Sequence, residues 1–220
     1  MPNSIDHLVW FRRDLRLGDN PAWAAATKQA DQVTALFVLD PALFDRAGTF
    51  RQQALVAHLR CLDAQLRERG GRLRIEHGDP AVVVPSIMNT LAADRVHWNT
   101  DTTPYAVPRD TNVAAALGDR VQTHWGTFVH EPGRVLTGRG TLSKVFTPFY
   151  NVWNKTEMTA WVTGEGDATV ADEAGAGLPQ LGSAQEHAAG EHAARERLHN
   201  FLGRIDDYLD TRDLPAVDGT

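Results

Sequence analysis

Short apolar runs alternate with helical patterns along the first 130 residues. Five apolar runs predict buried strands, at 7–11, 33–39, 73–75, 95–99 and 121–125. The segments between them predict helices over 21–30, over 49–69, from residue 80 and over 104–117, with Pro85 expected to kink the third helix or mark its true start. This alternation predicts right-handed crossovers and a doubly wound, five-stranded parallel sheet, which makes 1–130 a Rossmann-like α/β domain.

The strand–helix rhythm stops after residue 130. Residues 131–190 contain a glycine-rich turn, a short helix expected to begin at Pro148, and an acidic stretch without apolar periodicity, so they predict a mobile interdomain linker. Residues 191–220 predict the first helix of an incomplete all-α domain, over 191–208. Its apolar stripe has no evident cover in the chain and comprises Leu198, Phe201, Leu202, Ile205, Tyr208 and Leu209.

Composition narrows the class of protein. The chain has 220 residues, of which 42% are hydrophobic and 23% charged, as in a soluble globular protein. No run approaches the roughly 18 apolar residues of a membrane span and no secretion signal is visible, so a cytoplasmic location is expected. The single cysteine, Cys61, excludes an internal disulfide and a cysteine-rich zinc site.

The net charge of −6 first argues against nucleic acid as a partner. Residues 1–163, however, carry 18 Lys and Arg against 16 Asp and Glu, while residues 164–190 carry five acids and no base. The acidity therefore belongs mainly to the last quarter of the chain, and it says little about the surface of the α/β domain.

The usual nucleotide and hydrolase motifs are missing. The chain has no GxGxxG after the first strand, no P-loop and no GxSxG elbow. His187, His192 and His199 are spaced by five and seven residues, which does not suit one helical face, so we expect solvated histidines and assign no metal site.

The most informative segment is WFRRDLRLGDNPA, at residues 10–22. Three arginines and two aspartates crowd the turn between the first strand and the first helix, at the edge where such sheets bind ligands. From the residues alone, this cluster is either a structural ion network or an anion-binding site.

That segment closely resembles the N-terminal signature of the DNA photolyase/cryptochrome family. Further matches occur in the same order along essentially the whole chain: Leu39-Asp40-Pro41, WNTD at 98–101, Pro104-Tyr105, Arg109-Asp110, KVFTPF at 144–149, Tyr208, Arg212-Asp213, Pro215 and Gly219-Thr220. The resemblance implies an N-terminal α/β domain that often carries an antenna chromophore, followed by a helical domain that binds FAD and damaged DNA.

The resemblance implies that most of the repair machinery lies beyond residue 220. Only Tyr208 and Thr220 match FAD contacts, no catalytic residue is assigned, and the six tryptophans are expected to pack in the core or between domains. The full-length relative would be a monomeric deoxyribodipyrimidine photo-lyase that splits cyclobutane pyrimidine dimers with excited reduced FAD, whereas this chain alone is predicted to be inactive. A cryptochrome-type photoreceptor fragment and a stand-alone nucleotide-binding α/β module are the alternatives.

The same resemblance indicates an antenna site. Tyr105-Ala106 stands where folate-type photolyases carry an Asn-Glu pair, which disfavours methenyltetrahydrofolate, and the surrounding segment is closer to the type that binds 8-hydroxy-5-deazaflavin. A flavin-type antenna, and loops that only brace the helical domain, are the alternatives. The residues implied to bind the antenna are Val38, Leu39, Asp40, Arg51, Asp101, Thr102, Thr103, Pro104, Tyr105 and Arg109.

Overall fold

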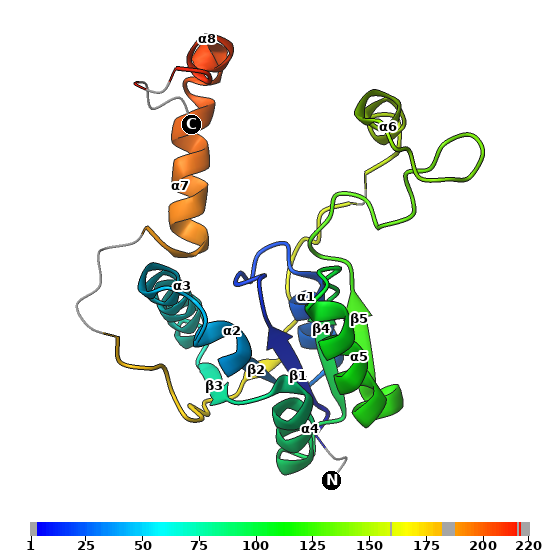
Figure 1. Cartoon of the computed structure of the whole chain (residues 1–220). Helices are drawn as coiled ribbons and strands as arrows, with labels where there is room; N and C mark the ends of the chain where they lie inside the picture. The colour runs from blue at the N-terminus through cyan, green and yellow to red at the C-terminus, as the bar shows by residue number, and fades with distance from the viewer. Residues whose placement is uncertain (1–3, 159, 182–187, 215, 217–220) are drawn as a thin grey trace.

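The computed structural model describes residues 4–158, 160–181, 188–214 and 216. Its centre is a parallel sheet in the order β3-β2-β1-β4-β5, so the predicted doubly wound α/β fold is confirmed (Figure 1). The five strands are β1 Asp6–Phe11, β2 Gln32–Leu39, β3 Leu73–His77, β4 Arg95–Asn99 and β5 Val121–His124. Within the described parts of the chain, no helix is both long enough and apolar enough to cross a membrane.

Helices cover both faces of the sheet, as the sequence predicts. One face carries α1 (Pro21–Gln29) and α3 (Thr49–Arg67), and the other carries α4 (Pro80–Thr90) and α5 (Ala106–Leu117). Two short elements complete this part, α2 (Pro41–Phe44) and the 3-10 turn η1 (Gly118–Arg120). Since α4 continues through Pro85, that proline does not mark the start of the helix.

Capping side chains set the beginnings of several helices. The Asn20 side chain accepts a hydrogen bond from the Trp23 N–H at the start of α1, at 3.2 Å. Asp79 does the same for Ala81 at the start of α4, at 2.9 Å, and each helix has a proline in its first turn. The Asp-Pro and Asn-Pro pairs therefore fix where the chain leaves the sheet.

The two faces of the sheet carry separate apolar clusters. Phe11, Phe37 and Leu59 belong to the cluster under α1 and α3, and Leu8 and Val38 belong to the one under α4 and α5. Each cluster contains tryptophan. Trp10, Trp23 and Trp98 are at most 2% exposed, as expected for tryptophans that pack in the core, whereas Trp161 is 74% exposed.

The acidic stretch contains a sixth strand that the apolar pattern does not predict. β6 (Thr169–Val170) lies parallel to the beginning of β2, where Ala171 N–H donates to the Val33 carbonyl at 2.9 Å. Acids of this stretch pair with arginines from the end of α3 into β3. Glu165 pairs with Arg69 at 2.8 Å, and two further pairs are Asp172 with Arg72 and Glu173 with Arg74. This part of the expected linker is therefore fastened to the sheet.

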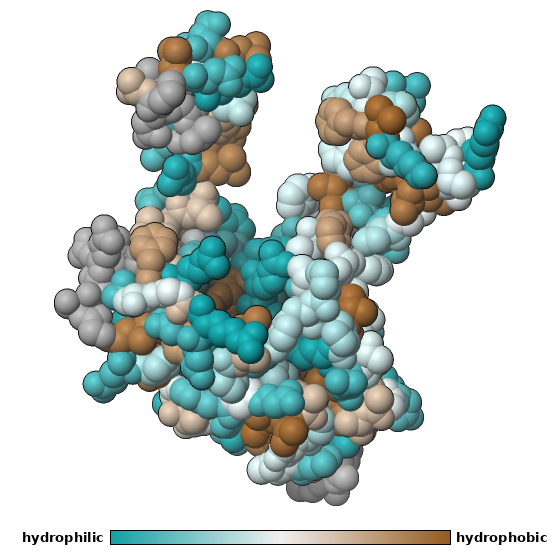
Figure 2. All heavy atoms as spheres, in the orientation of Figure 1, coloured by the Kyte–Doolittle hydropathy of each residue, from teal (hydrophilic) through white to brown (hydrophobic). Residues whose placement is uncertain are grey.

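Two helical arms rise above the carboxyl ends of the strands (Figure 1). The first is α6 (Phe146–Trp153), which begins two residues before the predicted Pro148. The second consists of α7 (Gly190–Leu202), the 3-10 turn η2 (Ile205–Asp207) and α8 (Tyr208–Thr211), so the single helix predicted over 191–208 is broken after α7. Both arms show apolar surface (Figure 2).

Candidate functional site

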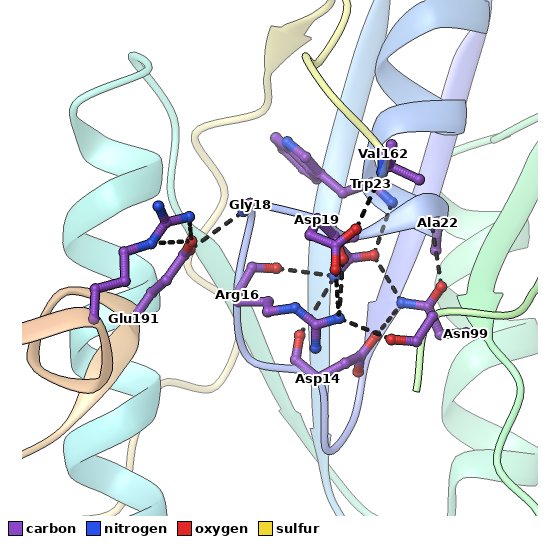
Figure 3. A network of polar contacts seen from close by, with 12 residues as sticks. Asp14, Arg16, Gly18, Asp19, Ala22, Trp23, Asn99, Val162 and Glu191 are labelled. Carbon is purple, nitrogen blue, oxygen red and sulfur yellow. Dashed lines mark hydrogen bonds and ion pairs between the residues drawn. The ribbon is translucent and has the colours of Figure 1, made fainter. Parts of the chain in front are cut away.

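A buried hydrogen-bond network holds the turn that follows β1 (Figure 3). The Asn99 amide, at the end of β4, donates to Asp14 at 2.5 Å and to the Asn20 side chain at 2.7 Å, and its oxygen accepts from the Ala22 N–H at 3.2 Å. Arg16 donates to the Asp19 carbonyl at 2.9 Å and to a second carbonyl nearby. Most of the arginine-rich turn is thus a structural network.

Arg12 belongs to the same network but also borders a cavity. It pairs with Asp110 at 2.6 Å and donates to the Asn99 carbonyl. Burial lowers the pKa of Arg12, and the partly buried Asp110 opposes that effect. The guanidiniums of Arg12 and Arg109 both lie 4.9 Å from the centre of the Trp10 ring. These two cations against one indole ring hold the Trp10 side chain in place at the carboxyl end of β1.

The cavity of about 260 Å³ opens at the carboxyl ends of β1 and β2. Its walls come from both strands, from α2 and α3, and from the first residues of α4 and α5. Most lining residues are apolar, while charge comes from four arginines and one aspartate; the lining consists of Trp10, Arg12, Arg13, Phe37, Val38, Leu39, Asp40, Leu43, Phe44, Ala47, Arg51, Gln52, Leu55, Pro80 and Arg109. Such a site suits a planar apolar ring with a few polar groups.

Asp40 is the carboxylate of this cavity and is held from two sides. It caps α2 by accepting from the Ala42 N–H at 2.9 Å, and it accepts a hydrogen bond from the Tyr105 hydroxyl. Burial, followed by the hydrogen bond to Asp40, raises the pKa of Tyr105 to about 12. Tyr105 therefore keeps its proton and fixes the orientation of the carboxylate.

Arg51 differs from the other arginines of the cavity. Arg12 and Arg109 both pair with Asp110, at 2.6 and 2.8 Å. No ion pair or hydrogen bond joins the Arg51 guanidinium to a side chain among the described residues. This cation is therefore available to a ligand.

Half of the expected antenna residues meet at the cavity. The five that line it are Val38, Leu39, Asp40, Arg51 and Arg109. Tyr105 adjoins the cavity through Asp40, whereas four residues of the loop after β4 do not line it: Asp101, Thr102, Thr103 and Pro104.

Asp101 is engaged within its own loop. It accepts from the Thr103 N–H at 2.9 Å and lies 3.6 Å from the Arg13 guanidinium. Although burial opposes the effect, the hydrogen bonds from Thr103 hold the pKa of Asp101 below its usual value. Its negative charge thus faces Arg13.

Several cavity residues were not among those expected from the sequence: Leu43 and Phe44 from α2, Gln52 and Leu55 from α3, and Trp10 near the end of β1. Leu55 has the spacing of the leucines that α3 buries in the core, yet it is only partly buried and also lines the cavity. A usable signal was present, because Trp10 lies at the carboxyl end of β1 and Arg12 directly follows the strand, and β1 is the neighbour of β2 in a sheet of this order.

The FAD contacts implied by the resemblance are not assembled in the described residues. Thr220 lies outside them, and Tyr208 packs edge-on against Phe201, with ring centres 5.6 Å apart. A single tyrosine hydroxyl does not make a dinucleotide site, so the described residues of this chain do not form a site for FAD. His192 and His199 are exposed, in agreement with the solvated state expected for them. His187 lies outside the described residues.

Comparison with known proteins identifies the family to which this architecture belongs. The model of the DNA photolyase family matches residues 7–166, from β1 to the acidic stretch. The chain belongs to the DNA photolyase family. A deoxyribodipyrimidine photo-lyase of Synechococcus sp. (strain PCC 6301) is 36% identical over 97% of this chain and 49% of its own length. An uncharacterised 31.6 kDa protein of Synechococcus sp. (strain PCC 6716) is 34% identical over 97% of this chain and 81% of its own length.

Solved photolyase structures share the fold. A class III photolyase from Agrobacterium tumefaciens superposes with a TM-score of 0.84 at 26% identity, over 100% of this chain and 49% of its own. An archaeal photolyase from Sulfolobus tokodaii, solved with two FAD molecules, gives 0.63 at 28% identity over 76% of this chain and 38% of its own. The chain thus spans about half the length of the photolyases it matches.

Proposed function

We propose that this chain is the light-harvesting domain of a DNA photolyase and that its cavity holds 8-hydroxy-5-deazaflavin. The observation that carries the proposal is the apolar cavity at the carboxyl ends of β1 and β2, with an oriented carboxylate and an unpaired arginine in its wall. When bound, such a chromophore absorbs light and passes the excitation energy to a flavin. The archaeal relative solved with two FAD molecules is described as implying a novel light-harvesting cofactor, which supports a second chromophore in this family.

The residues of the cavity would hold and orient the ring. Leu39, Phe44 and Leu55 supply apolar contacts that exclude water from its faces. Asp40 accepts a hydrogen bond from a ring N–H or a ribityl hydroxyl, and Arg51 faces the anionic form of the ring. Because energy transfer depends on distance and orientation, rigid strand ends are a suitable support.

Binding of the chromophore tests the proposal directly. The purified chain should bind 8-hydroxy-5-deazaflavin, measured by its fluorescence, and Ala47→Trp should abolish binding by filling the cavity that Ala47 lines. Ala64→Trp, at an exposed position of α3, is the matched control and should bind as the unmodified chain does. Unchanged binding by the Ala47 variant would show that the chromophore lies elsewhere.

We further propose that damaged DNA is the substrate of the complete photolyase, bound by the helical domain together with FAD. The supporting observations are the family membership and the single described FAD candidate, Tyr208, in this chain. The 220-residue chain with added FAD should therefore show no light-dependent repair of pyrimidine dimers. Turnover in that assay would refute the assignment of the repair chemistry to the helical domain.

A further inference from the structure

A second hollow, of about 510 Å³, adjoins the chromophore cavity. The two share Arg12, Arg13 and Leu55 as a common wall. The second hollow lies between the turn after β1, α3 and the start of α7, close to the Gly18–Glu191 contact (Figure 3). Its lining is rich in cationic and titratable nitrogen groups, namely Arg12, Arg13, Arg16 and His58.

The only acidic side chain of this lining is already satisfied. Glu191 accepts from the Gly18 N–H at 3.2 Å and from Arg195 at 2.5 Å. Although burial opposes the effect, hydrogen bonds from Arg195 and from the Gly18 backbone hold the pKa of Glu191 below its usual value. Arg195 therefore balances the Glu191 charge, so this carboxylate does not neutralise the arginines of the wall.

Two nitrogen donors of the hollow remain open to a ligand. The Arg13 guanidinium is 72% exposed, and its nearest carboxylate oxygen, on Asp101, lies 3.6 Å away, beyond a hydrogen bond. His58 accepts from the Gly190 N–H through Nδ1 at 3.1 Å, so the proton of its neutral ring is on Nε2, where it can be donated. Arg12 and Arg16, by contrast, are held by protein partners.

We infer that the ligand of the chromophore cavity carries a phosphorylated tail, which lies in the second hollow with Arg13 as its phosphate anchor and His58 as an additional donor. This inference rests on the proposed function, because the ring must occupy the first cavity for its tail to reach the second. A guanidinium binds phosphate through two parallel N–H groups, and a ribityl chain leads from the ring past the shared wall. The two hollows thus divide the ligand, with the apolar part in one and the anionic part in the other.

Riboflavin and flavin mononucleotide form a ring-matched pair that tests this inference. They differ only in the terminal phosphate, and both are measured by flavin fluorescence on the full 220-residue chain. We expect the mononucleotide to bind about tenfold more tightly or better, a preference that salt weakens. Arg13→Gln should abolish the preference, which is the ratio of the two affinities, whatever it does to the affinity for riboflavin itself. Arg51→Gln, in the ring cavity, should change both affinities by the same factor.

Each result is decisive. Equal binding of the two flavins, or a preference that Arg13→Gln leaves intact, overturns the phosphate anchor while ring binding still stands. If neither flavin binds, the same comparison is made with 8-hydroxy-5-deazaflavin and its ribityl phosphate. Failure of all four compounds overturns the proposed function itself. Because Arg13 is 72% exposed, its variant should fold normally, which a near-ultraviolet circular dichroism spectrum checks.

Discussion

Gly190 shows how one missing side chain positions α7. Its φ is +85°, and a Cβ at this residue would lie 2.6 Å from the Cβ of Cys61 on α3. The absence of a side chain thus lets the start of α7 approach α3 closely enough for the Gly190 N–H to reach His58.

Gly190→Ala should therefore loosen α7 from α3 in addition to straining the backbone. We expect hydrogen exchange in α7 to rise markedly, because the helix must move away from Cys61. Gly118→Ala is the matched control, since Gly118 also has a positive φ, +61°, but no atom within 4 Å of the added Cβ. That control strains only its own backbone, because the φ and ψ of Gly118 lie outside the regions that side chains favour, and should cost about 1–3 kcal/mol. Equal exchange in α7 for the two variants would contradict this role of the contact.

Three histidines form a chain across the sheet, from β1 through β4 to β5, in which His7 and His97 are buried and His124 is half-buried. His97 lies 3.0 Å from His7 and 3.1 Å from His124, measured between ring nitrogens, and is fully buried. Burial, reinforced by the two neighbouring histidines, lowers the pKa of His97 to about 3. The pKa values of His7 and His124 are also lowered, mainly by burial.

Acid should therefore destabilise the fold through these residues. Below pH 6.5 or so the unfolded chain binds protons that the buried rings do not, so the free energy of unfolding falls as the pH falls. His97 alone should contribute about 1.4 kcal/mol per pH unit between roughly pH 6 and its folded pKa of about 3. Urea unfolding at several pH values measures the slope. His97→Gln should lower it, whereas His192→Gln, with its side chain 87% exposed, should leave it unchanged.

Residue types predicted which residues are buried better than they predicted which residues line the cavity. Leu39, Asp40 and Arg51 were all implied by the family resemblance, and the first two also lie at the end of a strand, at the ligand-binding edge of the sheet. Leu55 shares the spacing of the buried leucines of α3 and packs against the core, but it also lines the cavity. A residue at the end of such a stripe can face a cavity as well as the core, and periodicity does not distinguish these positions.

Among the elements, β6 depends on backbone contacts rather than on an apolar pattern. It has two residues and lies in a segment rich in glycine, alanine and acids, so no periodicity marks it. A close approach at Gly71 makes room for it, since a Cβ there would lie 2.5 Å from both the carbonyl oxygen and the Cγ1 of Val170. Sequence patterns of side chains therefore could not predict this strand.

Gly71→Ala should detach β6 from the sheet. The added methyl group meets backbone atoms of Val170, which cannot rotate away as a flexible side chain can. We expect faster hydrogen exchange and earlier proteolysis in 165–177, with the core of the sheet intact. Gly138→Ala, where nothing lies within 4 Å of the added Cβ, should behave as the unmodified chain. Unaltered protection of 165–177 in the Gly71 variant would show that this strand tolerates the methyl group.

For the whole molecule, the two helical arms carry apolar side chains that the described chain leaves exposed. Phe146 on α6 is 74% exposed and Leu209 on α8 is 71% exposed. Exposed apolar patches in soluble proteins mark surfaces that contact partners or promote association. The sequence predicted the uncovered stripe of 191–208, but it did not predict the second apolar face on α6.

Replacing these exposed residues should change association far more than stability. Phe146→Ser combined with Leu209→Ser should alter the free energy of unfolding by less than about 0.5 kcal/mol per site, while reducing dye binding to apolar surface. Leu62→Ala, at a fully buried core position, is the contrast and should cost about 2–5 kcal/mol. A large loss of stability in the double variant would mean that the arms are packed in solution.

The position of Trp10 gives the molecule an internal optical reporter. It is the only tryptophan among the residues that line the chromophore cavity, and two guanidiniums hold its ring in one orientation. A bound absorbing ring would therefore quench the emission of this indole most strongly. Comparing the chain with Trp10→Phe separates that signal from the other five tryptophans, so occupancy of the cavity can be followed without any label.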